Sequence, residues 1–217
     1  MWGEPSREGG LSDGDPMAQL SDQSGNSRAW TQSTGSFKPL YKTGILNSLA
    51  CARGEGFVGA VAQYWDGPDL SVLTAGHVFV IVKCDSEGVD TVGNGLWNLG
   101  TQSNDVFYPW TDSVIYDSTL SNSRKTVGDP TPALTSWRVV EVVSTSSEWT
   151  FKLDGSTIFT TGTNTVAGKT TPRLMRNNSG DALKGYLAGL YIFSAKLTTD
   201  RATMVAYIND RFALSMT

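Results

Sequence analysis

Apolar residues in this chain are gathered in short runs separated by polar turns, a pattern typical of β-strands. Residues 77–83 (HVFVIVK) are rich in β-branched side chains and predict a central strand. Residues 137–143 and 149–153 flank a Ser/Thr stretch and predict a hairpin, and Asp154-Gly155 favours a tight turn into a strand over 156–160. Shorter strands are expected at 49–52, 96–99, 106–110 and 113–116. These lengths and turn spacings predict a two-sheet antiparallel sandwich.

In the last thirty residues the spacing of the apolar positions changes. Residues 185–193 are almost continuously apolar or aromatic, as in a strand covered on both faces. After a polar break, Thr198 or Thr199 is expected to cap a helix, and Asp200 places negative charge at the positive end of its dipole. The apolar positions of this helix recur every three or four residues, at Met204, Val205, Ile208 and Phe212. The pattern predicts a strand followed by a short amphipathic helix.

This strand, the following 197–201 (LTTDR) and the terminal helix resemble the closing element of concanavalin A-like (LamG-type) jelly-roll domains. The segments 13–15, 22–26 and 39–47 are similar to the opening of such domains. At 50–54 the chain has Ala-Cys-Ala-Arg-Gly where the family usually ends a strand with Arg-Phe-Asp-Gly, so the local turn is expected to differ. The resemblance implies an all-β jelly-roll sandwich over 11–217 with a short C-terminal helix. Residues 1–10 are polar and Gly-rich, which predicts an arm before this domain that is ordered by contact or frayed.

The composition agrees with a single domain and argues against nucleic acid and membranes as partners. The chain has 217 residues, 39% of them hydrophobic, which is enough to bury one core. The net charge of −4 comes without a cluster of Lys or Arg, so nucleic acid is not an expected partner. The N-terminal segment has no apolar core and the run 78–82 is too short to cross a bilayer, so neither export nor membrane insertion is expected.

Cysteine and histidine are scarce. Cys51 and Cys84 each fall in an expected strand, and buried free thiols are favoured over a disulfide because a core of this size needs no crosslink. One His and two separated Cys cannot complete a tetrahedral zinc site.

Residues 71–77 (SVLTAGH) resemble the strand that carries the catalytic His of chymotrypsin-like serine proteases. That mechanism also needs an orienting Asp and a serine in a Gly-Asp-Ser-Gly-Gly turn. Ser179 lies instead in Asn-Asn-Ser-Gly-Asp, which has the wrong order. The pattern therefore favours His77 as a structural residue.

A second catalytic candidate is the acidic segment with Asp85, Glu87 and Asp90, because jelly-roll glycoside hydrolases use paired carboxylates on a strand. These acids follow the apolar run and surround Gly88, as in a solvated turn, which cannot hold two carboxylates rigidly. We therefore expect no enzyme activity.

Two sets of residues are candidates for binding. Trp65, Trp97, Tyr108 and Trp110 lie near expected loops, where exposed rings could stack on sugars. Oxygen-bearing side chains near the start of the chain could surround Ca²⁺ or simply cap turns: Asp13, Asp15, Asp22 and Asn26.

The resemblance implies a non-catalytic binding or structural module. The leading interpretation is a surface protein of a tailed-bacteriophage virion (capsid decoration, head fibre or tail component), made in the host cytoplasm and oligomeric or lattice-bound. Its partners would be other virion proteins or cell-surface glycans. The alternatives are a soluble, extracellular carbohydrate-binding lectin domain and, less favoured, a glycoside hydrolase.

Overall fold

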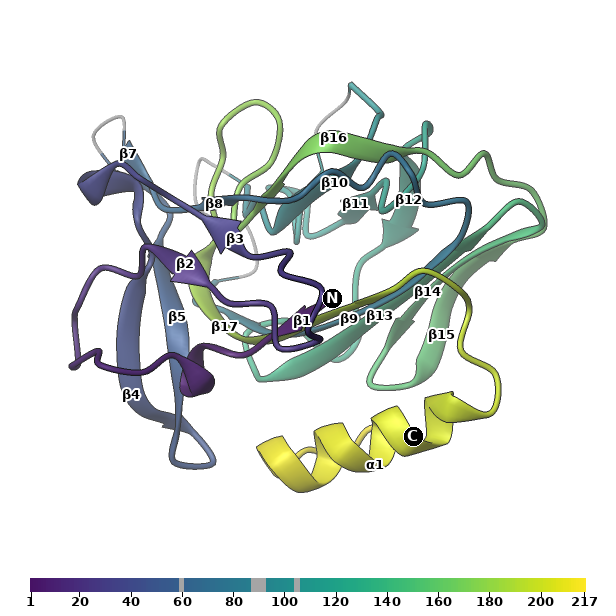
Figure 1. Ribbon diagram of the computed structural model, residues 1–217. Coiled ribbons are helices and arrows are strands. Elements are labelled where there is room, and N and C mark those ends of the chain that lie inside the picture. Colours follow the sequence, from purple (N-terminus) through teal and green to yellow (C-terminus); the bar gives the residue numbers. More distant parts are fainter. Residues whose placement is uncertain (59–60, 87–92, 104–105) are drawn as a thin grey trace.

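The computed structural model describes residues 1–58, 61–86, 93–103 and 106–217. Two antiparallel sheets pack face to face, and a helix covers the main sheet on the side away from the smaller one (Figure 1). The main sheet has the strand order β15-β14-β13-β9-β17-β5-β4, and the smaller sheet has the order β10-β16-β8-β3-β2. The predicted antiparallel sandwich with a C-terminal helix is confirmed.

The bounds of the elements are as follows. The main sheet contains β4 (Leu40–Leu46), β5 (Leu49–Glu55), β9 (Gly76–Cys84), β13 (Arg138–Thr145), β14 (Glu148–Leu153), β15 (Ser156–Thr161) and β17 (Lys184–Phe193), with β1 (Trp2–Gly3) beside β17. The smaller sheet contains β2 (Gln19–Leu20), β3 (Trp30–Thr31), β8 (Trp65–Asp66), β10 (Trp97–Gly100) and β16 (Gly168–Leu174). Short ribbons and helices complete the chain: β6 (Phe57–Val58), β7 (Val61–Ala62), β11 (Ile115–Asp117), β12 (Lys125–Gly128), η1 (Pro5–Arg7), η2 (Gly35–Phe37) and α1 (Asp200–Phe212).

The central strand β9 is apolar on both faces because it lies between two cores. Val78, Val80 and Val82 point into the core between the sheets, whereas Phe79 and Ile81 belong to the cluster under α1. Successive side chains of a strand point to opposite faces, so a strand covered on both sides needs a continuous apolar run. This explains why 77–83 could be recognised in the sequence.

The hairpin of β13 and β14 also forms as predicted, with Val142 opposite Phe151. Asp154 and Gly155 turn the chain into β15 with φ of 49° and 88°. Both values lie in the left-handed region that Asp-Gly adopts readily. A Cβ at position 155 would also lie 1.8 Å from the carbonyl oxygen of Thr217, so this turn requires glycine for space as well as for conformation.

Helix α1 buries Met204, Ile208 and Phe212 against the main sheet, as its spacing predicts. Thr199 is the N-cap residue, as predicted, but the expected hydrogen bond is absent: its φ and ψ are helical, at −68° and −44°, and its side chain makes no capping hydrogen bond. The helix ends at Phe212, and the next residue, Ala213, is left-handed with a φ of 53°.

Other expectations are refined at the ends of the sheets. Residues 106–110 form an isolated bridge, Phe107 to Tyr116, rather than a strand. Residues 1–10 are ordered by contact, since Trp2 pairs with Tyr191 of β17 and brings β1 into the main sheet. Cys51 and Cys84 are buried free thiols, as predicted. Within the described ranges, no helix combines the length and apolar character needed to span a membrane.

Candidate functional site: an aromatic groove beside α1

The expected sugar-stacking platform is not present at the predicted residues. Trp65, Trp97 and Tyr108 are 0% exposed, so their rings have no face open to a ligand. Trp65 Nε1 donates to the Met17 carbonyl (3.1 Å) and Trp97 Nε1 donates to Asp117 (3.1 Å), so the polar tips are satisfied inside the core. Trp65 and Trp97 lie in very short strands of the smaller sheet and Tyr108 lies outside the strands, so the sequence pattern resembles that of loops.

Trp110 is half-buried and lies apart from the core rings. Its ring centroid is 4.1 Å from that of Phe107. The structure brings Trp97 and Tyr108 together, with centroids 5.5 Å apart, but in the core. Trp110 thus remains as one partly accessible ring of the predicted four.

The candidate calcium ligands are engaged in local hydrogen bonds. Asp22 accepts from the backbone N–H of Trp2, Ser24 and Arg28. The remaining three also have partners: Asp13 accepts from Thr43 N and Lys42 Nζ, Asp15 accepts from Ser12 N, and Asn26 donates to Ser24. The described residues contain no group of three His, Cys, Asp or Glu that could hold a metal. Calcium binding stays an untested prediction, and turn capping accounts for these side chains.

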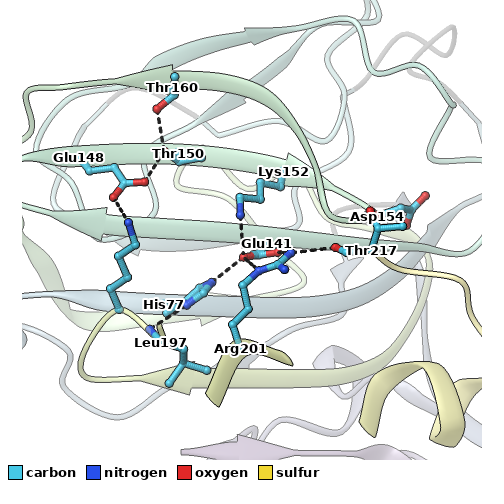
Figure 2. Close-up of polar contacts among 11 residues, drawn as sticks. His77, Glu141, Glu148, Thr150, Lys152, Asp154, Thr160, Leu197, Arg201 and Thr217 are labelled. Atoms are coloured by element: carbon cyan, nitrogen blue, oxygen red, sulfur yellow. Dashed lines mark hydrogen bonds and ion pairs between the residues drawn. The ribbon is translucent and has the colours of Figure 1, made fainter. Parts of the chain in front are cut away.

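His77 has both ring nitrogens occupied (Figure 2). Its Nδ1 accepts the backbone N–H of Leu197 at 3.1 Å, so the proton resides on Nε2, which donates to Glu141 Oε1 at 2.9 Å. The side chain is 1% exposed. His77 is therefore a satisfied structural residue, as its sequence context indicates. Ser179 in turn donates to Asn177 and Asp181.

Glu141 is the centre of the polar cluster in Figure 2, and no motif in the sequence points to it. Its carboxylate is 0% exposed and accepts two hydrogen bonds of 2.8 Å from Arg201, with Lys152 at 3.5 Å. Burial alone would raise its pKa, but the bonds from Arg201 and His77 outweigh it and lower the pKa to about 2. The cluster fixes the first turn of α1 and the preceding connection to the main sheet.

A second buried carboxylate, Glu4, holds the opposite end of the helix. It accepts from Tyr191 (2.7 Å), Arg211 (3.1 Å) and Tyr207, and it also pairs with Arg7 (3.1 Å). Its side chain is fully buried, yet these donors hold its pKa below the usual value. Glu4 therefore ties β1 and η1 to α1.

Between these two clusters lies a cavity of about 610 Å³, which we call the aromatic groove. It is lined by Trp2, Arg7, Tyr191, Phe193, Leu197, Asp200, Thr203, Met204 and Tyr207. Trp2 stacks on Tyr191 with centroids 6.0 Å apart and planes at 19°, and the Arg7 guanidinium lies 5.1 Å from the Trp2 ring. Leu197 and Tyr207 link the groove to the buried carboxylates that fix its walls.

Two polar side chains of the groove are free. Asp200 and Thr203 are exposed on the first turn of α1, and neither has a side-chain hydrogen bond or ion pair within the part of the chain that the structure describes. An aromatic wall beside an unpaired carboxylate and hydroxyl is a composition that suits sugars, which present an apolar C–H face and a hydroxyl edge. The sequence predicts only an arm at residues 1–10 and a charge at the helix dipole at Asp200, so it does not identify Trp2 or Asp200 as residues of a binding site.

The acidic segment at the opposite end of the main sheet has a different character. Asp85 and Glu55 both pair with Arg53, at 2.6 and 3.0 Å. The Arg53 guanidinium lowers the pKa of both carboxyl groups, so neither is set up to remain protonated at neutral pH as a general acid. Glu87 and Asp90 lie outside the described residues.

No protein-family model and no curated protein sequence matches the chain. Solved structures do match in fold. The receptor-binding domain of botulinum neurotoxin mosaic serotype C/D gives a TM-score of 0.60 at 11% identity, over 90% of this chain and 49% of that one. A sialidase of Trypanosoma rangeli gives 0.58 at 7% identity, over 97% of this chain and 32% of the enzyme. Domain 4 of the arabinanase AbnA from Geobacillus stearothermophilus, in complex with arabinotriose, gives 0.54 at 16% identity, over 90% and 100%.

The chain thus spans about a third of the sialidase and half of the neurotoxin domain structure. At these identities the likeness concerns the fold alone. The chain has the β-sandwich architecture found in carbohydrate-binding and glycoside-hydrolase proteins.

Proposed function

We propose that this chain is a non-catalytic carbohydrate-binding β-sandwich domain and that the aromatic groove is its binding site. The observation that carries the proposal is the stacked pair of Trp2 and Tyr191 beside the free side chains of Asp200 and Thr203. The fold likeness to domain 4 of an arabinanase bound to arabinotriose supports the class of ligand. The groove volume also falls within the range of about 300–1,000 Å³ of small-molecule sites.

The groove offers a separate contact for each side of a sugar ring. The half-buried Trp2 can pack against the C–H face, and the Asp200 carboxylate can accept hydrogen bonds from two hydroxyl groups at the edge. Glu4 and Glu141 fix the elements around the groove before any ligand arrives. The walls therefore lose little conformational entropy when a ligand binds, and this favours affinity.

The arrangement of acids supports a binding rather than a catalytic role. Glycoside hydrolases of both stereochemical classes use two carboxyl groups that flank the scissile bond. Among the described residues that line the groove, Asp200 alone carries a carboxyl group on its side chain. Asp85 and Glu55 share one guanidinium, which keeps both ionised. The described lining of the groove therefore offers one carboxyl group instead of two, and the Asp85–Glu55 pair offers none that is held protonated.

The structures named above favour the lectin alternative over the virion surface protein, because one of them is an arabinanase domain in complex with arabinotriose. They offer no support for the virion role, and attachment to capsid or tail proteins stays a prediction.

A glycan array followed by calorimetry tests the proposal. We expect Asp200→Ala to weaken binding of a retained glycan by about tenfold or more, since hydrogen bonds to a charged group are worth about 1.5–3 kcal/mol. Asp210→Ala removes an exposed carboxylate of the same helix outside the groove, and it should bind like the unmodified protein. Retention of no glycan, or equal binding by Asp200→Ala, would refute the site, and release of reducing sugar would refute the non-catalytic role.

A further inference from the structure

A second cavity adjoins the aromatic groove. This end cavity has a volume of about 760 Å³, and Gln23, Arg28, Leu70 and Val72 are among the residues that line it. Trp2 and Phe193 line both cavities. The two cavities therefore share Trp2 and Phe193 as a common wall.

The shared rings stand where the main sheet ends. The aromatic groove is lined by Tyr191 and Met204, which belong to the cluster under α1. The end cavity is lined by Leu70 and Ile192, which belong to the core between the sheets. Trp2 and Phe193 thus form a rim between the outer face of the main sheet and the end of the sandwich.

The end cavity has free polar groups of its own. Within the described ranges, neither the Gln23 amide nor the Arg28 guanidinium has a side-chain hydrogen bond or ion pair. Val72 adds an apolar side chain that is 66% exposed. The end cavity therefore combines apolar surface with polar side chains that are available for hydrogen bonds, as the aromatic groove does.

We propose that the ligand is a linear oligosaccharide that crosses Trp2 and Phe193 and occupies both cavities, rather than a single terminal sugar in the aromatic groove. The inference rests on the proposed function and specifies its ligand. A sugar packed on the Trp2 ring lies at the boundary, so glycosidic bonds can continue the chain to either side. Asp200 and Thr203 contact units on one side, and Gln23 and Arg28 contact units on the other.

A ligand of this kind has a characteristic dependence on length. Each additional unit that reaches the end cavity adds contacts without a new loss of translational freedom, so affinity should rise until both cavities are filled. If only a terminal sugar is bound, in the aromatic groove, the affinity does not depend on how many further sugar units are attached to it.

The test uses an array that carries linear gluco-, arabino- and N-acetyllactosamine oligosaccharides, each as a series from disaccharide to hexasaccharide, and repeats the retained series by calorimetry. We expect the hexasaccharide to bind about tenfold or more tighter than the disaccharide. Arg28→Ala should bring this ratio close to one, whereas Asp200→Ala should weaken every member of the series. Lys38→Ala removes a cation outside both cavities and should leave the ratio unchanged.

The failures of the two proposals are distinguishable. Binding that does not depend on length, with Arg28→Ala indistinguishable from Lys38→Ala, would overturn the extended site and leave the aromatic groove as a site for one sugar. Retention of no oligosaccharide at all would remove both proposals. Arg28 is exposed, so its truncation is not expected to affect folding, and circular dichroism of each variant checks this.

Discussion

Glu141 shows how one residue can fix the geometry of a neighbouring site without contacting it. Its buried charge is balanced by Arg201 on α1, Lys152 on β14 and the Nε2–H of His77. The other nitrogen of His77 accepts the N–H of Leu197, which lines the aromatic groove. A single carboxylate therefore links α1, β14 and β9 to the wall of the groove. Its removal leaves the buried donors of these side chains without an acceptor.

We expect Glu141→Gln to lower the free energy of unfolding at pH 7 by roughly 3 kcal/mol, because breaking a buried charge pair on one side costs about 3–5 kcal/mol. The pKa of Glu141 is lowered from 4.5 in the unfolded reference to about 2 in the folded protein. Since the folded pKa is the lower one, this stabilisation is present above pH 4.5 and is lost as the pH falls toward 2. Urea unfolding across this range should show the difference between the two proteins vanishing at acid pH.

Glu148→Gln is the matched control for this series. Glu148 pairs with Lys196 but its side chain is 27% exposed, so we expect a loss of at most about 1 kcal/mol. A gap between Glu141→Gln and the unmodified protein that stays constant down to pH 2 would show that the carboxylate does not titrate as the structure implies.

At the scale of elements, sequence pattern is informative only where an element is long and covered. Strands β9 and β17 are buried on both sides by the smaller sheet and α1, so their apolar runs are continuous and were recognised. Strand β8 consists of Trp65 and Asp66, which is too short to show a period of two. Its tryptophan therefore resembles a loop residue in the sequence, although it is completely buried in the core between the two sheets.

The groove could be predicted even less well than the strands. Its wall depends on β1, a strand of two residues, and on the pairing of Trp2 with Tyr191 far along the chain. Neither hydrophobic period nor turn chemistry encodes such a contact. Asp200 and Thr203 could be placed on a helix from the sequence, but not beside an aromatic ring of the N-terminal segment.

The C-terminal end of α1 gives a prediction for this element. Ala213 is exposed and left-handed, with a φ of 53°, a conformation in which a Cβ is unfavourable. We expect Ala213→Gly to raise the free energy of unfolding by about 1 kcal/mol, as glycine is the preferred residue after a helix. Ala202→Gly, at an exposed position inside the same helix, should lower it by about 1 kcal/mol. Thermal and urea unfolding measure both, and equal signs for the two variants would contradict the assigned cap.

At the scale of the whole molecule, the main sheet joins two apolar clusters. Its inner face packs on the smaller sheet and its outer face packs on α1, so the centre of the sheet is covered on both sides. The amides of β9 pair with β13 on one side and with β17 on the other. Exposing them to water requires the separation of several layers at once, and this makes the domain cooperative.

Native-state hydrogen exchange in rising urea should show this order of stability. We expect amides of β9 and β17 to exchange only through global unfolding, with a free energy equal to that from urea denaturation. Strand β15 should exchange at lower free energy, because it pairs with β14 on one side and its residues are partly exposed. Exchange of β9 well below the global value while β16 of the smaller sheet stays protected would show that the two layers unfold separately. In that case the groove, which is built on the main sheet and α1, would open without unfolding the smaller sheet.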